Sequence, residues 1–223
     1  FEVNDSNLTR FKAIKPINKH YNFAPFGINI LSMSKRIMNE VFCLAEDMGL
    51  TVFYQDTDSG HYYVDEIDKL AKEYKNIYNR DLIGKNLGQF HSDFANVSKD
   101  GNMPTAVKSI FLGKKSYIDM LVDNTGALGF HARMKGVTSN AIVNTANRMF
   151  PDTVPVEFRD GLYYPMTTTD GSKCVSIYEL YKTLYNGEEV AFDLVDEYNP
   201  RFELHKDKTI SSKGSFIRKV KFA

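Results

Sequence analysis

The sequence predicts an α+β fold in which helices back an antiparallel sheet and a smaller mixed α/β segment follows. Apolar residues recur at three- and four-residue spacing from Gly27 to Met48 and again from Ile67 to Tyr78, which is typical of amphipathic helices. Runs rich in aromatic and branched residues at 109–113, 115–122 and 127–135 predict strands. An Asp-Asn-Thr-Gly turn between the last two runs favours an antiparallel hairpin.

The order of the first elements follows from local signals. The opening residues are polar and irregular, with Pro16 among them, and predict a loop or an edge segment. Gly49 stands where a helix C-cap belongs, so the first helix leads directly into a hairpin predicted at 53–64. Residues 79–106 contain several glycines and predict loops before the strands begin.

Beyond residue 135 the pattern changes. A short helix is predicted around 140–149, and the proline-containing loop after it is the best domain boundary on composition. Ser176 and Glu179 form a capping-box pattern that predicts the start of another helix, which Asn-Gly at 186–187 should end. The tail is predicted to form short strands.

Composition limits the possible functions. The chain has 223 residues and 43% hydrophobic content, enough to bury a real core. Lys and Arg total 28, as do Asp and Glu, so net charge gives no general preference for a polyanion. Cys43 and Cys174 lack zinc-site spacing and indicate a reducing, intracellular setting. No apolar run is long enough to span a membrane, so we expect no membrane partner.

A short acidic stretch, FYQDTDSGHYYV at 53–64, is the first candidate site. Hairpin turns favour Asp, Ser and Gly, so an ordinary solvated turn is one interpretation. A calcium loop counted from Asp56 would need Gly at its sixth position and Glu at its twelfth, where the sequence has His61 and Ile67. If the pair lies on a strand, Asp56 and Asp58 face the same way and could hold Mg²⁺ together with water and substrate phosphate.

The motifs around this stretch resemble those of family B DNA polymerases, and they occur in the family's order. YQDTDS is similar to the YxDTDS motif of the polymerase palm. GKKSYI at 113–118 is similar to the KxY motif, with Lys115 and Tyr117 in the matching positions. MKGV at 134–137 is similar to the Lys-Gly step that leads from palm to thumb.

Two further segments resemble the protein-primed phage and linear-plasmid members of that family. They are FAPFGINILSMSKR at 23–36, which precedes the palm motif, and LGQFHSDF at 87–94. The resemblance covers roughly residues 23 to 140. It implies a palm-type antiparallel sheet in residues 1–137 and a DNA-gripping thumb in 138–223. A primer-dependent family B enzyme is the nearest alternative subclass.

The resemblance implies a role for each matching residue. Asp58 would bind both catalytic Mg²⁺ ions, for which Mn²⁺ is a possible substitute, and Asp56 would be a weaker or supporting ligand. The reaction would be attack of a primer 3′-hydroxyl on the α-phosphate of a dNTP. The residues expected to contact primer–template DNA are Tyr54, Thr57, Lys114, Lys115, Tyr117, Lys135, Lys213, Arg218 and Lys219.

The C-terminal residues suggest nucleic-acid contact independently of any family. Between residues 201 and 222 the sequence has seven Lys and Arg residues, interleaved with phenylalanines, against one Asp and one Glu. Such a segment fits a surface that follows a phosphate backbone. A solvated edge strand guarded by lysines is the alternative.

The sequence also departs from the family. The DxxSLYP and KxxxNSxYG motifs and the exonuclease DxE are absent, and Asp93 stands where relatives more often have Glu. We therefore expect an N-terminal polymerase part in the same or another chain, and no activity without it. A terminal protein primer is a possible partner, and the cytoplasm of a host cell is the expected location. The alternative is a non-catalytic DNA-binding or assembly module that keeps the palm–thumb scaffold.

Overall fold

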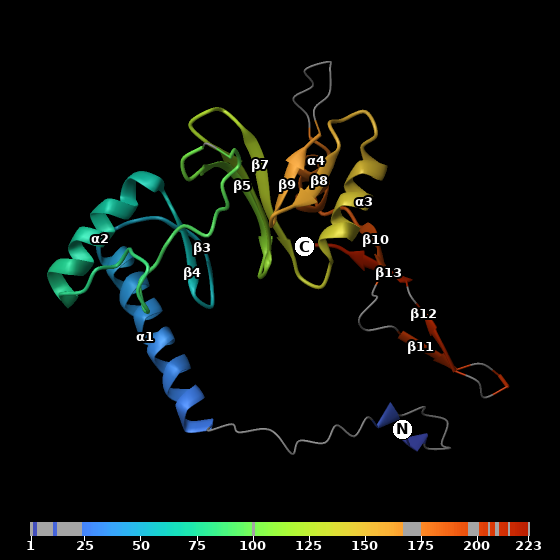
Figure 1. Ribbon diagram of the computed structural model, residues 1–223, viewed down its shortest axis with the longest axis horizontal. Helices are drawn as coiled ribbons and strands as arrows, with labels where there is room; N and C mark the ends of the chain where they lie inside the picture. Colours follow the sequence, from blue (N-terminus) through green and yellow to red (C-terminus); the bar gives the residue numbers. More distant parts are fainter. Residues whose placement is uncertain are drawn as a thin grey trace.

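The computed structural model describes residues 2–3, 11–12, 24–99, 101–166, 175–195, 201–204, 206–207, 210–213 and 215–222. Over these residues the chain is α+β, with antiparallel sheets and helices packed beside them (Figure 1), which confirms the predicted fold class. The elements in chain order are β1 (Glu2–Val3), β2 (Phe11–Lys12), α1 (Ala24–Asp47), β3 (Val52–Asp56), β4 (Ser59–Tyr62), α2 (Val64–Tyr78), β5 (Thr105–Gly113), β6 (Ser116–Val122), β7 (Leu128–Met134), α3 (Ser139–Met149), β8 (Val156–Arg159), β9 (Leu162–Pro165), α4 (Ser176–Tyr185), β10 (Val190–Val195), β11 (Arg201–Leu204), β12 (Ile210–Lys213) and β13 (Ser215–Val220).

The first two helices and the β3–β4 hairpin form one packed unit. Both helices begin slightly before the residues that the periodicity predicted. Helix α1 ends at Asp47, and the chain leaves it through the expected glycine, Gly49, which has a φ of 68°. Leu44 and Ala45 on α1 pack with Leu70 and Tyr74 on α2 in a shared apolar cluster. The amphipathic pattern is therefore explained by helix–helix packing beside the hairpin.

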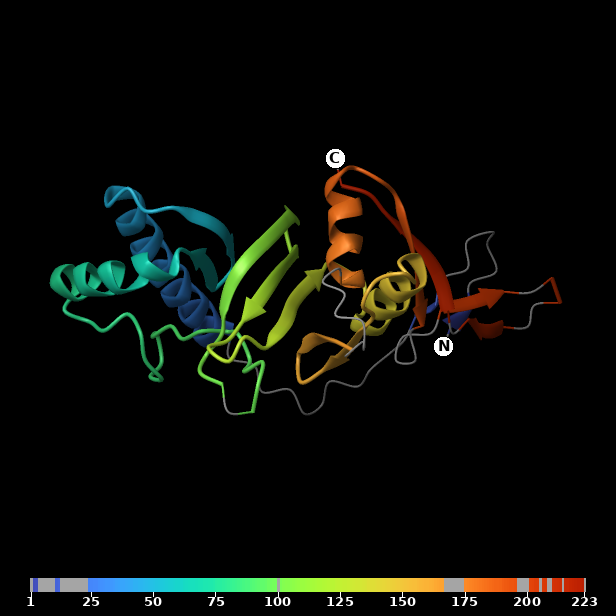
Figure 2. The same ribbon diagram turned by 90° about the horizontal axis from the view of Figure 1, so that it is seen from above.

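A five-stranded antiparallel sheet in the order β5-β6-β7-β9-β8 lies at the centre of the molecule. Seen from above, it stands between α1, α2 and the hairpin on one side and α3 and α4 on the other (Figure 2). Strands β5 to β7 are the three that the sequence predicted. Strands β8 and β9 were not predicted, and β9 joins the sheet at Phe130 of β7, which pairs with Tyr163.

The two faces of this sheet differ in chemistry because side chains alternate along each strand. One face buries Ile118 and Phe130 in the main apolar cluster with α3 and α4. The opposite face carries a polar row in which Ser109, Asp119 and His131 pair in register across β5, β6 and β7. That second face is the one toward the β3–β4 hairpin, because His61 of the hairpin contacts Asp119.

The main apolar cluster contains residues from both sides of the boundary expected after residue 137. Ile118 and Phe130 pack with Ile142, Leu180 and Phe192 in one continuous core. The core therefore shows no boundary after residue 137, and the division into 1–137 and 138–223 stays a prediction.

Helix α4 begins differently from the predicted capping box. Its N-cap is Val175, without a side-chain cap, and the Ser176 hydroxyl instead donates to Asn147 Oδ1 over 2.8 Å. Asn147 also accepts from the backbone N–H of Val156 and donates to its carbonyl, each over 2.9 Å. The start of the helix is thus fixed by a tertiary contact. Its predicted end at Asn-Gly 186–187 is confirmed, since the helix ends at Tyr185, Asn186 is its C-cap and Gly187 has a φ of 84°.

The C-terminal strands form two further antiparallel pairs, β10 with β13 and β11 with β12. Val190 and Phe192 of β10 belong to the main apolar cluster, so the β10–β13 pair is anchored to the central body. Among the described residues, no helix combines the length and the apolar character needed to cross a bilayer.

Candidate functional site

The acidic stretch forms a tight turn at the end of the β3–β4 hairpin. Strand β3 ends at Asp56, which pairs with Ser59 at the start of β4, and Thr57 and Asp58 make the turn between them. Asp58 is therefore not a strand residue, and the expectation that Asp56 and Asp58 share one strand face is wrong. Thr57 adopts a φ of 41°, and the turn closes with the Asp58 N–H donating to the Asp56 carbonyl.

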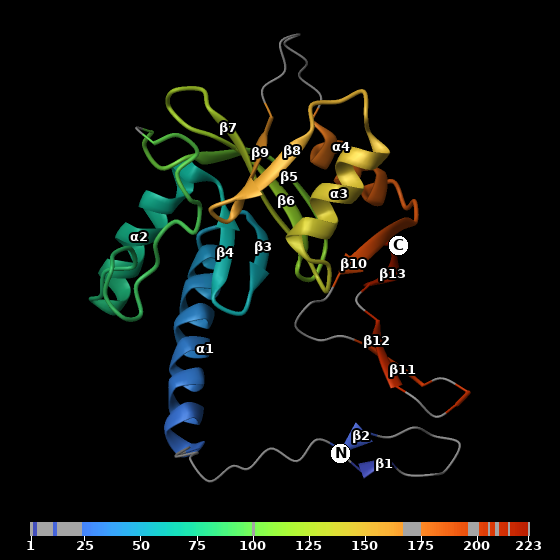
Figure 3. The same cartoon turned by 45° about the vertical axis from the view of Figure 1, so that its right-hand side comes forward.

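The KxY stretch forms a second tight turn that meets the first. Gly113 pairs with Ser116, so Lys114 and Lys115 make the two-residue connection between β5 and β6. The backbone N–H of Lys115 donates to the Tyr54 hydroxyl over 2.7 Å, and its Nζ lies 2.8 and 3.0 Å from the two Asp56 carboxylate oxygens. Figure 3 shows the two hairpins side by side. Two motifs that are far apart in sequence are thus in direct contact.

Both turns hold backbone conformations that their residues rarely adopt. Among the described non-glycine residues, positive φ occurs only at Thr57, Asn79, Lys115 and Asp160. Asn and Asp tolerate this region, whereas a β-branched Thr and a Lys do so at a cost of about 1–2 kcal/mol each. Such strain persists where surrounding contacts enforce it, and it concentrates at functional sites.

The two aspartates of the turn differ in their surroundings. A hydrogen bond from Lys115 lowers the pKa of Asp56, burial opposes this, and the Thr57 hydroxyl adds to the lowering. The same contact raises the pKa of Lys115. The Asp58 side chain is exposed, and its carboxylate makes no hydrogen bond or ion pair with the part of the chain that the structure describes. Asp58 is therefore the open carboxylate of the pair, while Asp56 is engaged with Lys115.

The pair can supply only part of a metal site. Mg²⁺ commonly takes one or two protein carboxylates and completes its shell with water and phosphate oxygens, which suits Asp56 and Asp58. Within the described ranges, no three His, Cys, Asp or Glu side chains converge so as to hold a metal ion. A metal bound at this turn would therefore depend on ligands from substrate, from solvent or from another polypeptide segment.

Aromatic rings hold the first hairpin against the central sheet. The Tyr54 ring stacks on Phe111 with a centroid distance of 5.3 Å and lies 4.9 Å from the ring of Tyr117. Tyr117 is only 9% exposed, and burial raises its pKa to about 12. The Tyr117 ring therefore packs against the hairpin and is not open to stack on a DNA base in this structure, and its predicted contact with primer–template DNA stays a prediction.

Several of the predicted DNA-contacting cations gather near the second turn, and we call Lys114, Lys115, Lys135 and Arg218 the basic edge. The backbone N–H of Lys135 donates to the Ser116 hydroxyl, which places Lys135 beside the Lys114–Lys115 turn. Arg218 on β13 donates to the Gly136 carbonyl over 2.9 Å, so the C-terminal strand reaches the same end of the sheet. The motif residues and part of the basic tail therefore converge.

The remaining two tail predictions do not join this group in the same way. Lys219 forms an exposed ion pair with Glu189 over 2.9 Å. Glu189 directly precedes β10, and the composition of the tail alone does not indicate this partner. Lys213 belongs to β12, but its side chain lies outside the described residues.

The structure adds residues that sequence patterns did not select. Arg133 is exposed, pairs in register with Tyr117, and makes no ion pair with the described residues. His61 and the buried Asp119 join the hairpin to the sheet. The available signal was strand alternation, because Asp119 on β6 and His131 on β7 are polar residues that stand between apolar neighbours.

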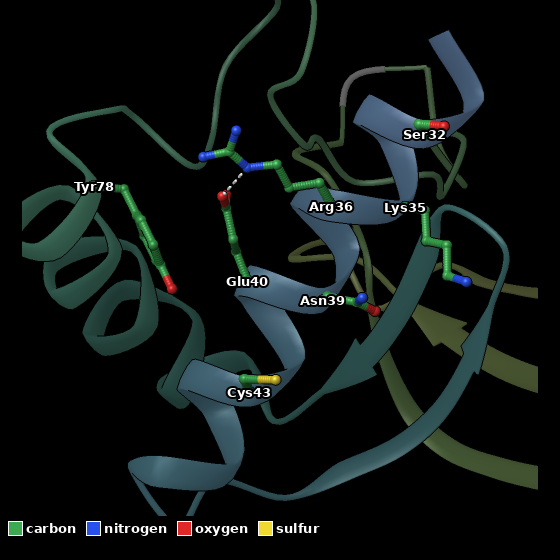
Figure 4. Close-up of a pocket in the computed structure, with 7 residues that line it drawn as sticks. All are labelled: Ser32, Lys35, Arg36, Asn39, Glu40, Cys43 and Tyr78. Atoms are coloured by element: carbon green, nitrogen blue, oxygen red, sulfur yellow. Dashed lines mark hydrogen bonds and ion pairs between the residues drawn. The ribbon is translucent and has the colours of Figure 1, made fainter. Parts of the chain in front are cut away.

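A separate shallow pocket of about 510 Å³ lies along α1 and faces Tyr78 of α2 (Figure 4). In it the Arg36 guanidinium pairs with Glu40 over 2.9 Å, and Glu40 also contacts Arg80 and the Tyr74 hydroxyl. The pocket is lined by Ser32, Lys35, Arg36, Asn39, Glu40, Cys43 and Tyr78. None of the residues predicted for the site lines it.

Comparisons of the chain with protein-family models, curated proteins and solved structures gave no match. The resemblance to family B polymerases therefore depends on the motifs themselves and stays a hypothesis.

Proposed function

We propose that this chain is the palm and thumb part of a DNA-directed DNA polymerase of the family B type. The observation that carries the proposal is the contact between the YxDTDS turn and the KxY turn, through Tyr54, Asp56 and Lys115. If the match of a short motif to a solvated turn were due to chance, there would be no reason for that turn to contact another motif of the set. The strained backbone at Thr57 and Lys115 supports the same conclusion.

The proposed chemistry is addition of a dNTP to a primer 3′-hydroxyl. Asp58, with Asp56 in support, would hold Mg²⁺ or Mn²⁺, and the bound metal would activate the hydroxyl and neutralise triphosphate charge. Lys115 would exchange the Asp56 carboxylate for a primer phosphate, since both are anions that a compact ammonium binds. The basic edge would follow the phosphate backbone of the primer–template.

The proposed enzyme needs a second polypeptide segment. The DxxSLYP and KxxxNSxYG motifs are absent from this sequence, so one carboxylate ligand and the triphosphate-binding Lys must come from elsewhere. The first half of α1 also presents exposed apolar side chains, which suits coverage by such a segment. These side chains are Phe26, Ile28, Ile30, Leu31 and Met33, each more than half exposed. A terminal protein primer and an intracellular host compartment complete the proposal.

The test is primer extension by the native assembly that contains this chain, whether one longer polypeptide or a complex. Asp58→Asn should lower the single-turnover extension rate at least about a hundredfold, because metal stabilisation of transition-state charge is worth several kcal/mol. Asp68→Asn is the matched control, since Asp68 is an exposed aspartate on α2. Extension by the Asp58 variant at the rate of the control would refute the proposal.

A non-catalytic DNA-binding module is the second candidate, because Asp56 is paired with Lys115 and the described residues offer no third metal-binding side chain nearby. Mn²⁺ added to this chain distinguishes the two. The polymerase proposal expects paramagnetic broadening of backbone resonances around Asp58, which Asp58→Asn removes. If the chain is a non-catalytic module, we expect no selective broadening by Mn²⁺ and unchanged DNA binding in the Asp58→Asn variant.

A further inference from the structure

A buried carboxylate lies directly beneath the hairpin that carries Asp58. Asp119 on β6 is fully buried, and polar groups from three other strands surround it. Ser109 on β5 donates from its hydroxyl to Oδ1 over 2.6 Å. His61 on β4 places Nε2 at 3.2 Å from Oδ2, and His131 on β7 places Nδ1 at 3.4 Å from the same oxygen.

The contacts of Asp119 fix where the hydrogens lie. Burial acts to raise the pKa of Asp119, but hydrogen bonds from the two histidines and from Ser109 outweigh it and lower the pKa to about 2. Asp119 is therefore an ionised carboxylate at neutral pH and can only accept hydrogen bonds. It follows that Nε2 of His61 and Nδ1 of His131 are the protonated nitrogens that face it.

Each histidine ring depends on this one carboxylate for its orientation. Nδ1 of His61 and Nε2 of His131 are buried and have no hydrogen-bond partner among the described residues. The bond to Asp119 is thus the one directional contact that each ring makes there, in addition to packing on aromatic neighbours. A buried polar ring with a single partner is sensitive to the loss of that partner.

Of the three donors to Asp119, His61 alone belongs to the β3–β4 hairpin. Ser109 and His131 belong to the same five-stranded sheet as Asp119, whereas β3 and β4 form a separate two-stranded sheet. An isolated two-stranded hairpin is marginally stable in water. The His61–Asp119 hydrogen bond is therefore a side-chain tether between the two sheets.

A short series of contacts connects this tether to the acidic turn. His61 pairs in register with Tyr54 across the hairpin, and their rings lie 5.5 Å apart. The Tyr54 hydroxyl accepts from the Lys115 N–H, and the Lys115 ammonium binds Asp56. A change in the position of His61 would therefore move Tyr54, whose hydroxyl contact with Lys115 determines how closely the two turns lie.

We propose that Asp119 is a positioning residue: by accepting the His61 hydrogen bond it fixes the β3–β4 hairpin so that the Asp58 turn lies opposite Lys115. The inference deepens the proposed function and rests on it, in that the placement affects catalysis only if Asp58 holds the metal. Asp119 itself is buried and contacts neither the turn nor the basic edge.

Paired substitutions at each histidine test the tether. The amide N–H of Gln lies near the position of a histidine Nε2, and that of Asn lies near Nδ1. His61→Gln therefore keeps the donor to Asp119, and His61→Asn loses it. At His131 the assignment is reversed, so His131→Asn keeps the donor to Asp119 and His131→Gln loses it. Residue 131 lies on β7, so both of these substitutions are outside the hairpin.

Two readouts separate positioning from general stability. The first is hydrogen exchange of the β3 and β4 amides in this chain, which needs no catalytic activity. We expect His61→Asn to speed this exchange about tenfold or more, the effect of losing a hydrogen bond to a charged group, and His61→Gln to stay within about twofold of the unmodified chain. Both His131 variants should leave exchange in β3 and β4 unchanged.

The second readout is single-turnover primer extension by the native assembly. We expect His61→Asn to lower the maximal single-turnover rate about tenfold with an unchanged half-saturating concentration of dNTP. His61→Gln should keep the unmodified rate, because the donor that positions the turn is retained. Equal exchange rates in the two His61 variants, or loosening of the hairpin by His131→Gln to the same extent, would overturn the proposal. If exchange behaves as expected while Asp58→Asn leaves extension intact, the proposed function fails and the positioning of the hairpin by Asp119 stands.

Discussion

Substitution of Asp119 by Asn should lower the free energy of unfolding and remove the part of it that depends on the ionisation of this carboxylate. Asp119 is fully buried and accepts three hydrogen bonds as a carboxylate. Asn has nearly the same shape, but its NH2 group would lie opposite hydrogen-bond donors and cannot accept a hydrogen bond from them. We therefore expect the Asp119→Asn chain to fold with a lower free energy of unfolding at neutral pH.

The magnitude follows from the pKa of Asp119, which its hydrogen bonds lower from 3.8 to about 2. At about 1.4 kcal/mol for each pH unit, this difference corresponds to roughly 2.5 kcal/mol. Because the folded-state pKa lies below the unfolded one, the stabilisation is fully present above about pH 4 and is lost as the pH falls toward about 2. The free-energy gap between wild type and variant should therefore narrow by roughly 2 kcal/mol between pH 7 and pH 2, where about half of the native carboxyl is still ionised.

Urea denaturation of both chains at several pH values between 7 and 2 measures this gap. Asp68→Asn, which removes an exposed carboxylate from α2, is the control and should show a gap near zero throughout. A gap for Asp119→Asn that stays constant with pH would show that the carboxylate is not held ionised by its neighbours. A gap of zero at pH 7 would refute the assigned hydrogen bonds altogether.

Three further outcomes are expected. Asn147→Ala removes three hydrogen bonds, two of them to the Val156 backbone, and should lower the free energy of unfolding by about 2–4 kcal/mol in urea titrations; a loss below about 1 kcal/mol would contradict the contacts. Tyr54→Phe keeps the stacked ring but frees the Lys115 N–H, so Tm should fall by about 2–4 °C in calorimetry, and an unchanged Tm would argue against that bond. Lys135→Gln should reduce the slope of log Kd against log salt for duplex DNA by about 0.9, and an unchanged slope would remove this lysine from the DNA contacts.

The helices and the first three sheet strands could be predicted because their signals are local. Amphipathic periodicity specifies a helix whatever partner covers its apolar side, and α1 and α2 use it to pack on each other. Strands β8 and β9 are short and stand in a proline-containing passage, and they exist because Phe130 of β7 offers a pairing edge to Tyr163. Pairing between strands distant in sequence leaves no periodic trace in either of them.

The candidate site was predicted in its residues but not in its geometry. The motifs selected Asp56, Asp58 and Lys115, and the structure brings their two turns into contact. The hairpin was predicted, but the residue at which β3 stops was not, because Thr57 adopts a positive φ that a β-branched residue seldom does. The tether between His61 and Asp119 was also missed, since spacing along one chain does not specify which strands meet.

The position of Lys115 links the two halves of the proposed chemistry. In this structure its ammonium is held by Asp56, which leaves Asp58 as the open carboxylate of the turn. Under the proposed function, a primer phosphate competes with Asp56 for Lys115, and a metal ion competes with Lys115 for Asp56. Phosphate binding to Lys115 would free Asp56 for the metal, and metal binding to Asp56 would free Lys115 for the phosphate. Primer binding and metal binding would therefore favour one another, and this coupling is reciprocal by thermodynamic necessity. Under the proposed function, the ion pair between the two motifs would be the resting arrangement of a site that opens when both of its ligands bind.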